Sequence, residues 1–147
     1  MDRLFQRTVM RRVTLACTLM LPLLAAGCGD DPVMPTTPST PTLVTDTFTG
    51  TVTRNGATSH PFPIVSAAGG DVTAVLKTLS PDATATVGMS LGTWNGTGCQ
   101  AVISNDRATV ASAILGSATS TGTLCVRIFD VGILNEPQDY EVQVEHP

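Results

Sequence analysis

The sequence predicts an all-β fold, a single antiparallel β-sandwich of seven or eight strands that follows an export signal and an extended linker. Apolar residues recur at every second position after residue 46, which is the period of half-buried strands. Turn-forming residues separate these runs at the short spacing of a sandwich. Residues 46–147 suffice for one hydrophobic core and are too few for two, so we expect one domain.

The first 27 residues have the organisation of an export signal. A basic segment with arginines at positions 3, 7, 11 and 12 precedes the apolar run Val13–Leu24, and three small residues follow at positions 25–27. The apolar run is shorter than the ~20 residues that a helix needs to cross a bilayer, so we expect no permanent membrane span.

The junction Leu23–Cys28, with the sequence LLAAGC, resembles a bacterial lipobox, with Ala25 where Leu is most common. The resemblance implies that Cys28 becomes the first residue of the mature chain and carries acyl groups, whose buried methylenes contribute about 0.8 kcal/mol each to membrane attachment. The membrane is then a partner, and the protein lies in the bacterial cell envelope, either periplasmic or surface-exposed. The alternative is ordinary secretory cleavage near Ala26 or Gly27, which would leave a free thiol.

Residues 28–45 are expected to form a lipid-anchored, disordered linker. The segment Asp30–Thr45 is rich in proline and threonine and contains few large apolar residues, so it cannot bury a core. We therefore expect an extended tether that holds the domain, residues 46–147, away from the membrane.

The charge balance excludes two classes of partner. From Cys28 onward the chain has four basic and eleven acidic residues, a net charge of −7. The basic residues are also scattered along the chain. Nucleic acid and anionic lipid head groups would both be repelled, so we expect neither as a partner.

The four cysteines divide by position. Cys17 lies in the export signal and Cys28 in the lipobox, which leaves Cys99 and Cys125 as a pair in an oxidising compartment. A disulfide between them would close a loop of about 25 residues and stabilise the fold by roughly 3 kcal/mol. A redox-active or metal-binding pair is the alternative, but it lacks a C-x-x-C spacing and nearby histidines.

Four alternating apolar runs identify strands in the domain. They are Val72–Leu76, Val87–Leu91, Leu124–Ile128 and Tyr140–Val144. Turns are expected at Asn55-Gly56, Gly69-Gly70-Asp71, Ser80-Pro81-Asp82, Asn95-Gly96, Asn105-Asp106 and Asn135-Glu136-Pro137. Residues 108–118 are ambiguous, because alanine permits a short helix whereas the β-branched Thr109, Val110 and Ile114 favour a strand; we predict a strand.

Five segments, taken in order, resemble the strand motifs of bacterial pre-peptidase C-terminal domains. They are Phe48–Val52, His60–Val65, Gly69–Leu76, Gly122–Ile128 and Tyr140–Val144. In that family an opening Phe-x-Gly strand, a His-x-Phe strand and later Gly-Thr and Tyr-containing strands build the domain. Leu124 and Cys125 stand where the late strand usually carries Tyr. The resemblance implies a jelly-roll-like β-sandwich with an accessory role and no activity of its own.

The sequence contains no recognisable catalytic constellation. Its histidines, His60 and His146, lie in no catalytic motif, and nucleophile-elbow, zinc-protease and P-loop patterns are absent. The acids Asp130, Glu136 and Asp139 could serve a glycosidase or, together with Asn135, bind calcium, but no calcium-loop spacing is present and solvated loop acids are favoured. We expect no catalytic residue, no metal and no cofactor, and therefore no enzyme.

The segment Gly92–Gly98 holds the one tryptophan, Trp94, among polar and glycine residues just before Cys99. An exposed indole beside Asn95 and Thr97 would suit a sugar ring, so these three are the candidate ligand-binding residues. The alternative is that Trp94 packs against the disulfide. Two functions follow: a non-enzymatic envelope lipoprotein whose sandwich binds a glycan or a protein partner, or a structural subunit of an envelope complex without a small ligand.

Overall fold

The computed structural model describes residues 40–147, and every regular element within that range is a β-strand. The strands are β1 (Val44–Val52), β2 (Ala57–Ile64), β3 (Gly70–Ser80), β4 (Val87–Trp94), β5 (Cys99–Ala108), β6 (Ala113–Ala118), β7 (Gly122–Phe129) and β8 (Gln138–His146). The predicted all-β fold is confirmed. The export signal, Cys28 and most of the linker lie outside the described residues, and within residues 40–147 there is no helix that could span a membrane.

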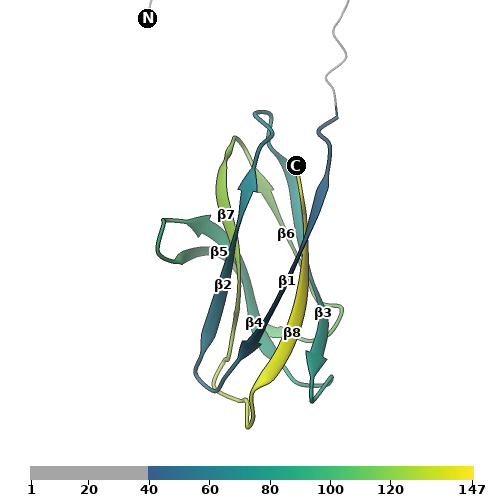
Figure 1. Cartoon of the computed structure of the whole chain (residues 1–147), viewed down its shortest axis with the longest axis vertical. Helices are drawn as coiled ribbons and strands as arrows, with labels where there is room; N and C mark the ends of the chain where they lie inside the picture. Colours follow the sequence, from purple (N-terminus) through teal and green to yellow (C-terminus); the bar gives the residue numbers. More distant parts are fainter. Residues whose placement is uncertain (1–39) are drawn as a thin grey trace, which may run out of the picture. The chain divides into compact units, whose positions relative to one another are not determined.

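The strands form two antiparallel sheets that pack face to face as a sandwich (Figure 1). Sheet A has the order β1-β8-β3-β6, and sheet B has the order β2-β7-β4-β5. Each strand in the first half of the domain pairs with its counterpart in the second half: β1 with β8, β2 with β7, β3 with β6, and β4 with β5. This is the pairing of one long hairpin rolled into two sheets, which defines a jelly roll.

The core lies between the sheets and is built from every second residue of the strands. The four alternating runs predicted from the sequence fall within β3, β4, β7 and β8, and their apolar side chains are buried there. Leu76, Met89 and Ile128 are among the largest fully buried side chains. Burial of these mainly aliphatic side chains drives folding. Aromatic side chains contribute little to the buried area because the chain has few of them.

Two boundaries differ from the expected ones. Strand β1 begins at Val44, two residues before the expected domain start at 46, because Val44 already pairs with His146 of β8. Within the ambiguous segment 108–118, residues 113–118 form β6 and residues 109–112 form a turn in which Ala111 has a φ of 71°. The choice of strand over helix is therefore confirmed for the second half of that segment.

The turn predicted at Asn105 and Asp106 is wrong, because both residues lie inside β5. The register of β5 against β4 shifts here: Val87 faces Ala108, whereas Met89 faces Asn105. Strand β5 thus carries an extra residue, a β-bulge. The side-chain oxygen of Asn105 accepts a hydrogen bond from the Arg107 N–H at 2.9 Å. This hydrogen bond of the Asn105 side chain is typical of a turn, but here it accompanies a bulge in β5 and does not end the strand.

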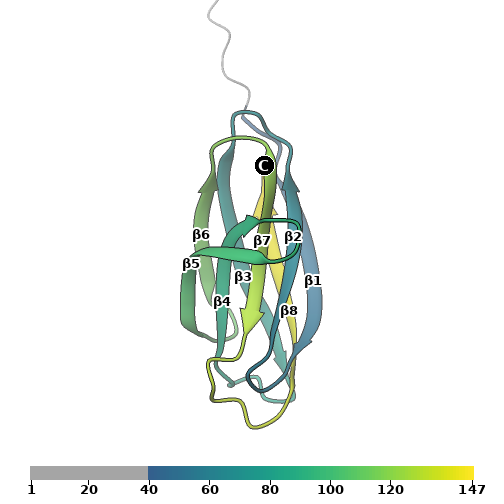
Figure 2. The ribbon, with the colours of Figure 1, turned by 90° about the vertical axis from the view of Figure 1, so that its left-hand side faces the viewer.

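Cys99 and Cys125 form a disulfide, as predicted. Strands β5 and β7 lie on either side of β4 in sheet B, and strands so placed are roughly 9–10 Å apart. The Cα atoms of the two cysteines are only 5.7 Å apart. The start of β5 therefore leaves the plane of the sheet and crosses its outer face, in front of β4 and β7 (Figure 2).

Strand β4 is buried on both sides except at its end, and the backbone of Gln100 and Ala101 in β5 lies against Gly92. Below the disulfide, the ring of Phe129 occupies the space that a side chain at Gly88 would need. The Arg127 guanidinium carbon lies 4.9 Å from the centre of the Phe129 ring, a cation–π contact that covers the ring. These contacts cover β4, so a ligand cannot lie directly against this strand.

Candidate functional site

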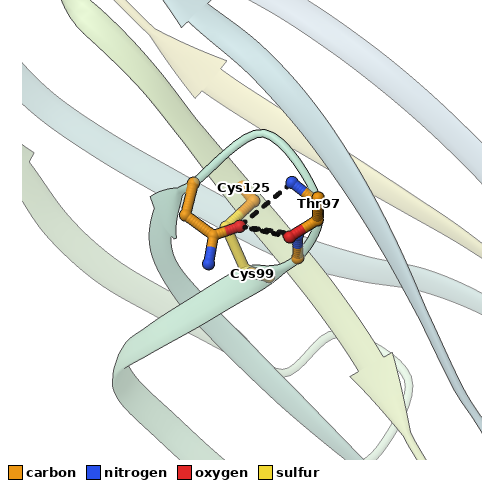
Figure 3. The surroundings of a disulfide bond; sticks show 5 residues. Thr97, Cys99 and Cys125 are labelled. Carbon is orange, nitrogen blue, oxygen red and sulfur yellow. Dashed lines mark hydrogen bonds between the residues drawn. A yellow bond between two sulfur atoms is a disulfide. The ribbon is translucent and has the colours of Figure 1, made fainter.

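The loop that follows Trp94 is held together by its own side chains (Figure 3). The side-chain oxygen of Asn95 accepts hydrogen bonds from the backbone N–H groups of Thr97 at 3.0 Å and Gly98 at 2.8 Å, and from the Thr97 hydroxyl at 3.0 Å. The Asn95 N–H in turn donates to the Gly98 carbonyl at 3.2 Å. The polar groups that were expected to meet a sugar are thus used to build the turn.

Trp94 is half-buried, so it is neither the open stacking platform nor the fully buried cap that the sequence left as alternatives. It is the last residue of β4 and faces Cys99 across the β4–β5 pair, next to the disulfide. Part of the indole remains accessible, while its position is fixed by the strand pair. The structure thus keeps Trp94, Asn95 and Thr97 together, with Trp94 half-buried and the side-chain oxygen of Asn95 already used by the turn.

A second site lies at the opposite end of the sandwich from the C-terminus, between the β3–β4 and β7–β8 loops (Figure 1). We call it the loop pocket. It has a volume of about 130 Å³. Its lining consists of two carboxylates, two amides, one hydroxyl and three aliphatic side chains: Asp82, Glu136, Asn135, Gln138, Thr86, Ala85, Ile133 and Leu134.

The floor of the loop pocket is rigid because its polar groups are hydrogen-bonded. Gln138 is only 2% exposed, and its side-chain oxygen accepts a hydrogen bond from the Asp82 N–H at 3.1 Å. The Asp82 carboxylate accepts hydrogen bonds from the Thr84 hydroxyl at 2.7 Å and from the Thr84 N–H at 2.8 Å. These bonds, with that of the Thr84 side chain the larger, lower the pKa of Asp82, so it is an ionised acceptor at neutral pH.

Asp130 fixes the shape of the β7–β8 loop that forms one wall of the pocket. One carboxylate oxygen accepts hydrogen bonds from the N–H groups of Gly132, Ile133 and Leu134 at 2.9–3.1 Å, and the other accepts from the Asn55 N–H at 2.7 Å. Desolvation opposes the charge on Asp130, but the four donors together outweigh it and lower the pKa of Asp130. This carboxylate is therefore a structural brace, and calcium would have to compete with four backbone donors for it.

A third cluster lies between the edge strands β1 and β2, and we call it the seam cluster. The ring of Phe48 stacks on His60 with centroids 5.0 Å apart, and His60 Nε2 lies 2.7 Å from the Tyr140 hydroxyl. Phe62 packs against His146, whose Nε2 lies 3.1 Å from a carboxylate oxygen of Asp46. Each histidine thus has one polar neighbour through Nε2, while His146 Nδ1 is buried without a hydrogen-bond partner. Neither histidine lines the open hollows described here.

The seam cluster brings together residues that carried the resemblance to pre-peptidase C-terminal domains. Phe48 and Gly50 come from β1, His60 from β2 and Tyr140 from β8, and these segments are distant in the sequence. Gly50 leaves the space that the Tyr140 ring occupies. These residues therefore have a packing role in this chain.

An open hollow of about 370 Å³ lies on the outer face of sheet A, lined by Thr49, Thr51, Asp139 and Glu141 among others. It offers hydroxyls and carboxylates but no exposed aliphatic side chain, and Asp139 already accepts a hydrogen bond from Thr51. The loop pocket is more enclosed and combines polar groups with an apolar wall. It is therefore the better candidate for a small ligand.

The sequence predicts the two loops that form the loop pocket only as separate turns. Asp82 belongs to the turn after β3 and Glu136 to the turn before β8, and the sequence alone does not show that these turns meet. The jelly-roll topology brings them to the same end of the sandwich. Nothing in the sequence singles out Gln138, because it is an ordinary polar residue at the start of a strand.

The acids that the sequence offers as calcium ligands are not brought together in the structure. Across residues 40–147, no three His, Cys, Asp or Glu side chains are placed to hold one metal ion. The acids considered for calcium are divided: Asp130 braces its loop, Glu136 lines the loop pocket and Asp139 lies on β8.

The fold and the loop pocket together define a jelly-roll β-sandwich with a small polar site among its end loops. A mitogen derived from Yersinia pseudotuberculosis has a similar structure, with 18% sequence identity and a TM-score of 0.50 over 69% of this chain and 84% of that one. A protein of the disulfide-linked pili that form Bacillus endospore appendages matches over 71% of this chain and 88% of its own, with 15% identity and a TM-score of 0.37, too low to support an argument. No family model and no curated protein matches the sequence. The likeness to the mitogen shows the fold alone.

Proposed function

We propose that this protein is a non-enzymatic lipoprotein of the bacterial cell envelope, anchored through acyl groups on Cys28, whose jelly-roll domain is an accessory module that binds carbohydrate in the loop pocket. The proposal includes membership of the pre-peptidase C-terminal family, which the packing of Phe48, His60 and Tyr140 in the seam cluster supports.

The lining of the loop pocket carries the proposal of carbohydrate binding. Sugar hydroxyls both donate and accept hydrogen bonds, and the pocket offers the carboxylates of Asp82 and Glu136 as acceptors and the amide of Asn135 as donor and acceptor. The buried Gln138 already accepts from the Asp82 N–H and holds the floor in place. The C–H groups of a sugar ring would lie against Ile133, which is 57% exposed. Because the pocket has a volume of only about 130 Å³, it can take at most one sugar residue at the end of a chain and not a long stretch of polymer.

A screen of glycans and peptidoglycan fragments against the full chain tests this proposal. Glu136→Gln removes a charge from the loop pocket, and Glu145→Gln makes the same change on an exposed residue at the far end of β8. We expect the wild-type chain and Glu145→Gln to bind a common glycan, and Glu136→Gln to lose it. Loss of binding in Trp94→Ala alone would move the site to the Trp94 loop, and a wild-type chain that binds no glycan would contradict the proposal.

The anchor is tested independently of the ligand. We expect the wild-type chain to incorporate a labelled fatty acid in bacterial cells and to sediment with membranes, and Cys28→Ser to do neither. A Cys28→Ser chain that still takes up label would refute lipid attachment at Cys28.

A structural role in an envelope complex is the second candidate function. The observation that favours it is an uncharged, partly apolar edge formed by β6 and the first seven residues of β5, where Val102 and Leu115 are strongly exposed.

A further inference from the structure

Strands β5 and β6 are the open edges of sheets B and A on one side of the sandwich. Leu115 on β6 is 68% exposed, and Val102 and Ile103 on β5 are 78% and 42% exposed. Between the two strands lies a groove of about 120 Å³ that reaches Leu91 in the core, with Gly116 on its rim. A side chain added at Gly116 would be in ordinary contact with Leu91, at 3.6 Å, so the groove exists because position 116 has none.

The opposite edge of the sandwich is protected against pairing, and this one is not. Edge strand β2 carries Pro61 and Pro63, which have no N–H to offer a further strand, and edge strand β1 turns the charged Asp46 inward. Strand β6 and the first seven residues of β5 contain neither proline nor a charged residue. An unprotected strand edge with exposed apolar side chains is a template for strand addition.

We propose that this edge binds a second copy of the same chain, with β6 pairing antiparallel to β6 of the second copy about a two-fold axis at Leu115. In this register Leu115 faces Leu115 of the second copy on the outer face of sheet A. On the inner face, Ile114 lies opposite Gly116 of the second copy, where a side chain is missing. Residues directly opposite each other in an antiparallel pair lie on the same face of the sheet, so the Leu115–Leu115 and Ile114–Gly116 contacts form in the same register.

Charge favours a second copy at this edge over any other face. The chain after Cys28 has a net charge of −7, so two copies repel each other over most of their surface. The uncharged strip is where they can approach at least cost. The two-fold arrangement uses up both β6 edges, so the assembly closes at two copies and does not grow.

The inference does not depend on the loop pocket. A pair of six-residue strands with the flanking β5 side chains lies at the small end of the roughly 1,200–2,000 Å² that stable interfaces bury, so we expect a dimer that dissociates readily in dilute solution.

Cysteine cross-linking of the full chain in bacterial cells tests the register. The Cα atoms of Leu115 and its counterpart would lie within the 4.4–6.8 Å that a disulfide spans, so Leu115→Cys should give an oxidised dimer. Co-expressed Ala113→Cys and Ser117→Cys chains should cross-link to each other, because these positions face one another across the two-fold axis. Thr47→Cys, which is also exposed but lies on the protected β1 edge, and the chain without an added cysteine are the controls and should remain monomeric.

Sedimentation of the purified full chain tests the dimer without cross-linking. Leu115→Lys would place two positive charges opposite each other, and we expect it to raise the dimer dissociation constant at least tenfold without loss of fold, since residue 115 is exposed. The inference is overturned if the folded wild-type chain stays monomeric at all concentrations. It is also overturned if Leu115→Cys forms no dimer, or if the mixed 113 and 117 variants do not cross-link.

Discussion

Gly50 and Tyr140 face each other across β1 and β8, and the Tyr140 ring fills the space that a side chain at residue 50 would take. A Cβ atom at Gly50 would lie 2.6 Å from the Tyr140 hydroxyl oxygen. Gly50→Ala must therefore displace a buried ring and its contact with His60, and we expect a loss of about 1–3 kcal/mol of unfolding free energy. Gly122→Ala, where no heavy atom lies within 4 Å of the new Cβ, is the matched control. Urea denaturation compares the two, and equal stabilities would contradict this role of Gly50.

His60 makes the stability of the domain depend on pH. Burial lowers the pKa of His60 below its ordinary value of 6.5, so the unfolded chain takes up a proton at higher pH than the folded chain. The unfolding free energy should therefore fall as the pH drops from about 6.5 toward the folded pKa, and level off below it. We expect His60→Gln to reduce this fall in urea titrations between pH 8 and 5. The pair of His146 and Asp46 is present in both chains and cancels in the comparison; an undiminished fall in the variant would show that other groups cause it.

The disulfide should contribute to stability and to the path of β5. Because Cys99 and Cys125 are 26 residues apart, we expect replacement of both by alanine to cost about 3 kcal/mol. The cost can be measured by thermal and urea unfolding. The start of β5, no longer attached over β4, should also become sensitive to limited proteolysis between residues 99 and 105. A variant with unchanged protease resistance would mean that strand pairing alone holds this segment in place.

The brace at Asp130 should matter more than its position near the surface suggests. Asp130→Ala leaves four backbone N–H groups without their acceptor, and we expect a loss of about 1–2 kcal/mol, because solvent can replace part of these bonds. Asp106→Ala removes an exposed acid on β5 and should change stability by less than about 0.5 kcal/mol. Denaturation midpoints of the two variants make the comparison. If they are equal, the loop is held by other contacts.

The strands that were predicted correctly are those whose alternation reflects one buried face. Val142 and Val144 of β8 alternate with exposed or half-buried polar residues, so the periodicity alone locates the strand. Strand β5 gave no such signal, because it is exposed on both faces for most of its length. Its identity depends on pairing with β4, a long-range interaction that no local pattern encodes.

The site was less predictable than the fold for a similar reason. Asn95 and Thr97 have side chains that suit a ligand, but the same chemistry suits a tight turn, and the turn takes them. The loop pocket depends on two turns more than fifty residues apart, and only the strand order brings Asp82 within hydrogen-bonding distance of Gln138. A motif search has no access to such a pair.

The measurement that tests the central claim most directly is a titration of the full wild-type chain, Glu136→Gln and Glu145→Gln with the best glycan found in the screen. Carbohydrate binding in the loop pocket predicts that Glu136→Gln raises the dissociation constant at least tenfold, or about 1.4 kcal/mol, while Glu145→Gln leaves it within a factor of two. Equal dissociation constants for the three folded chains would contradict the claim.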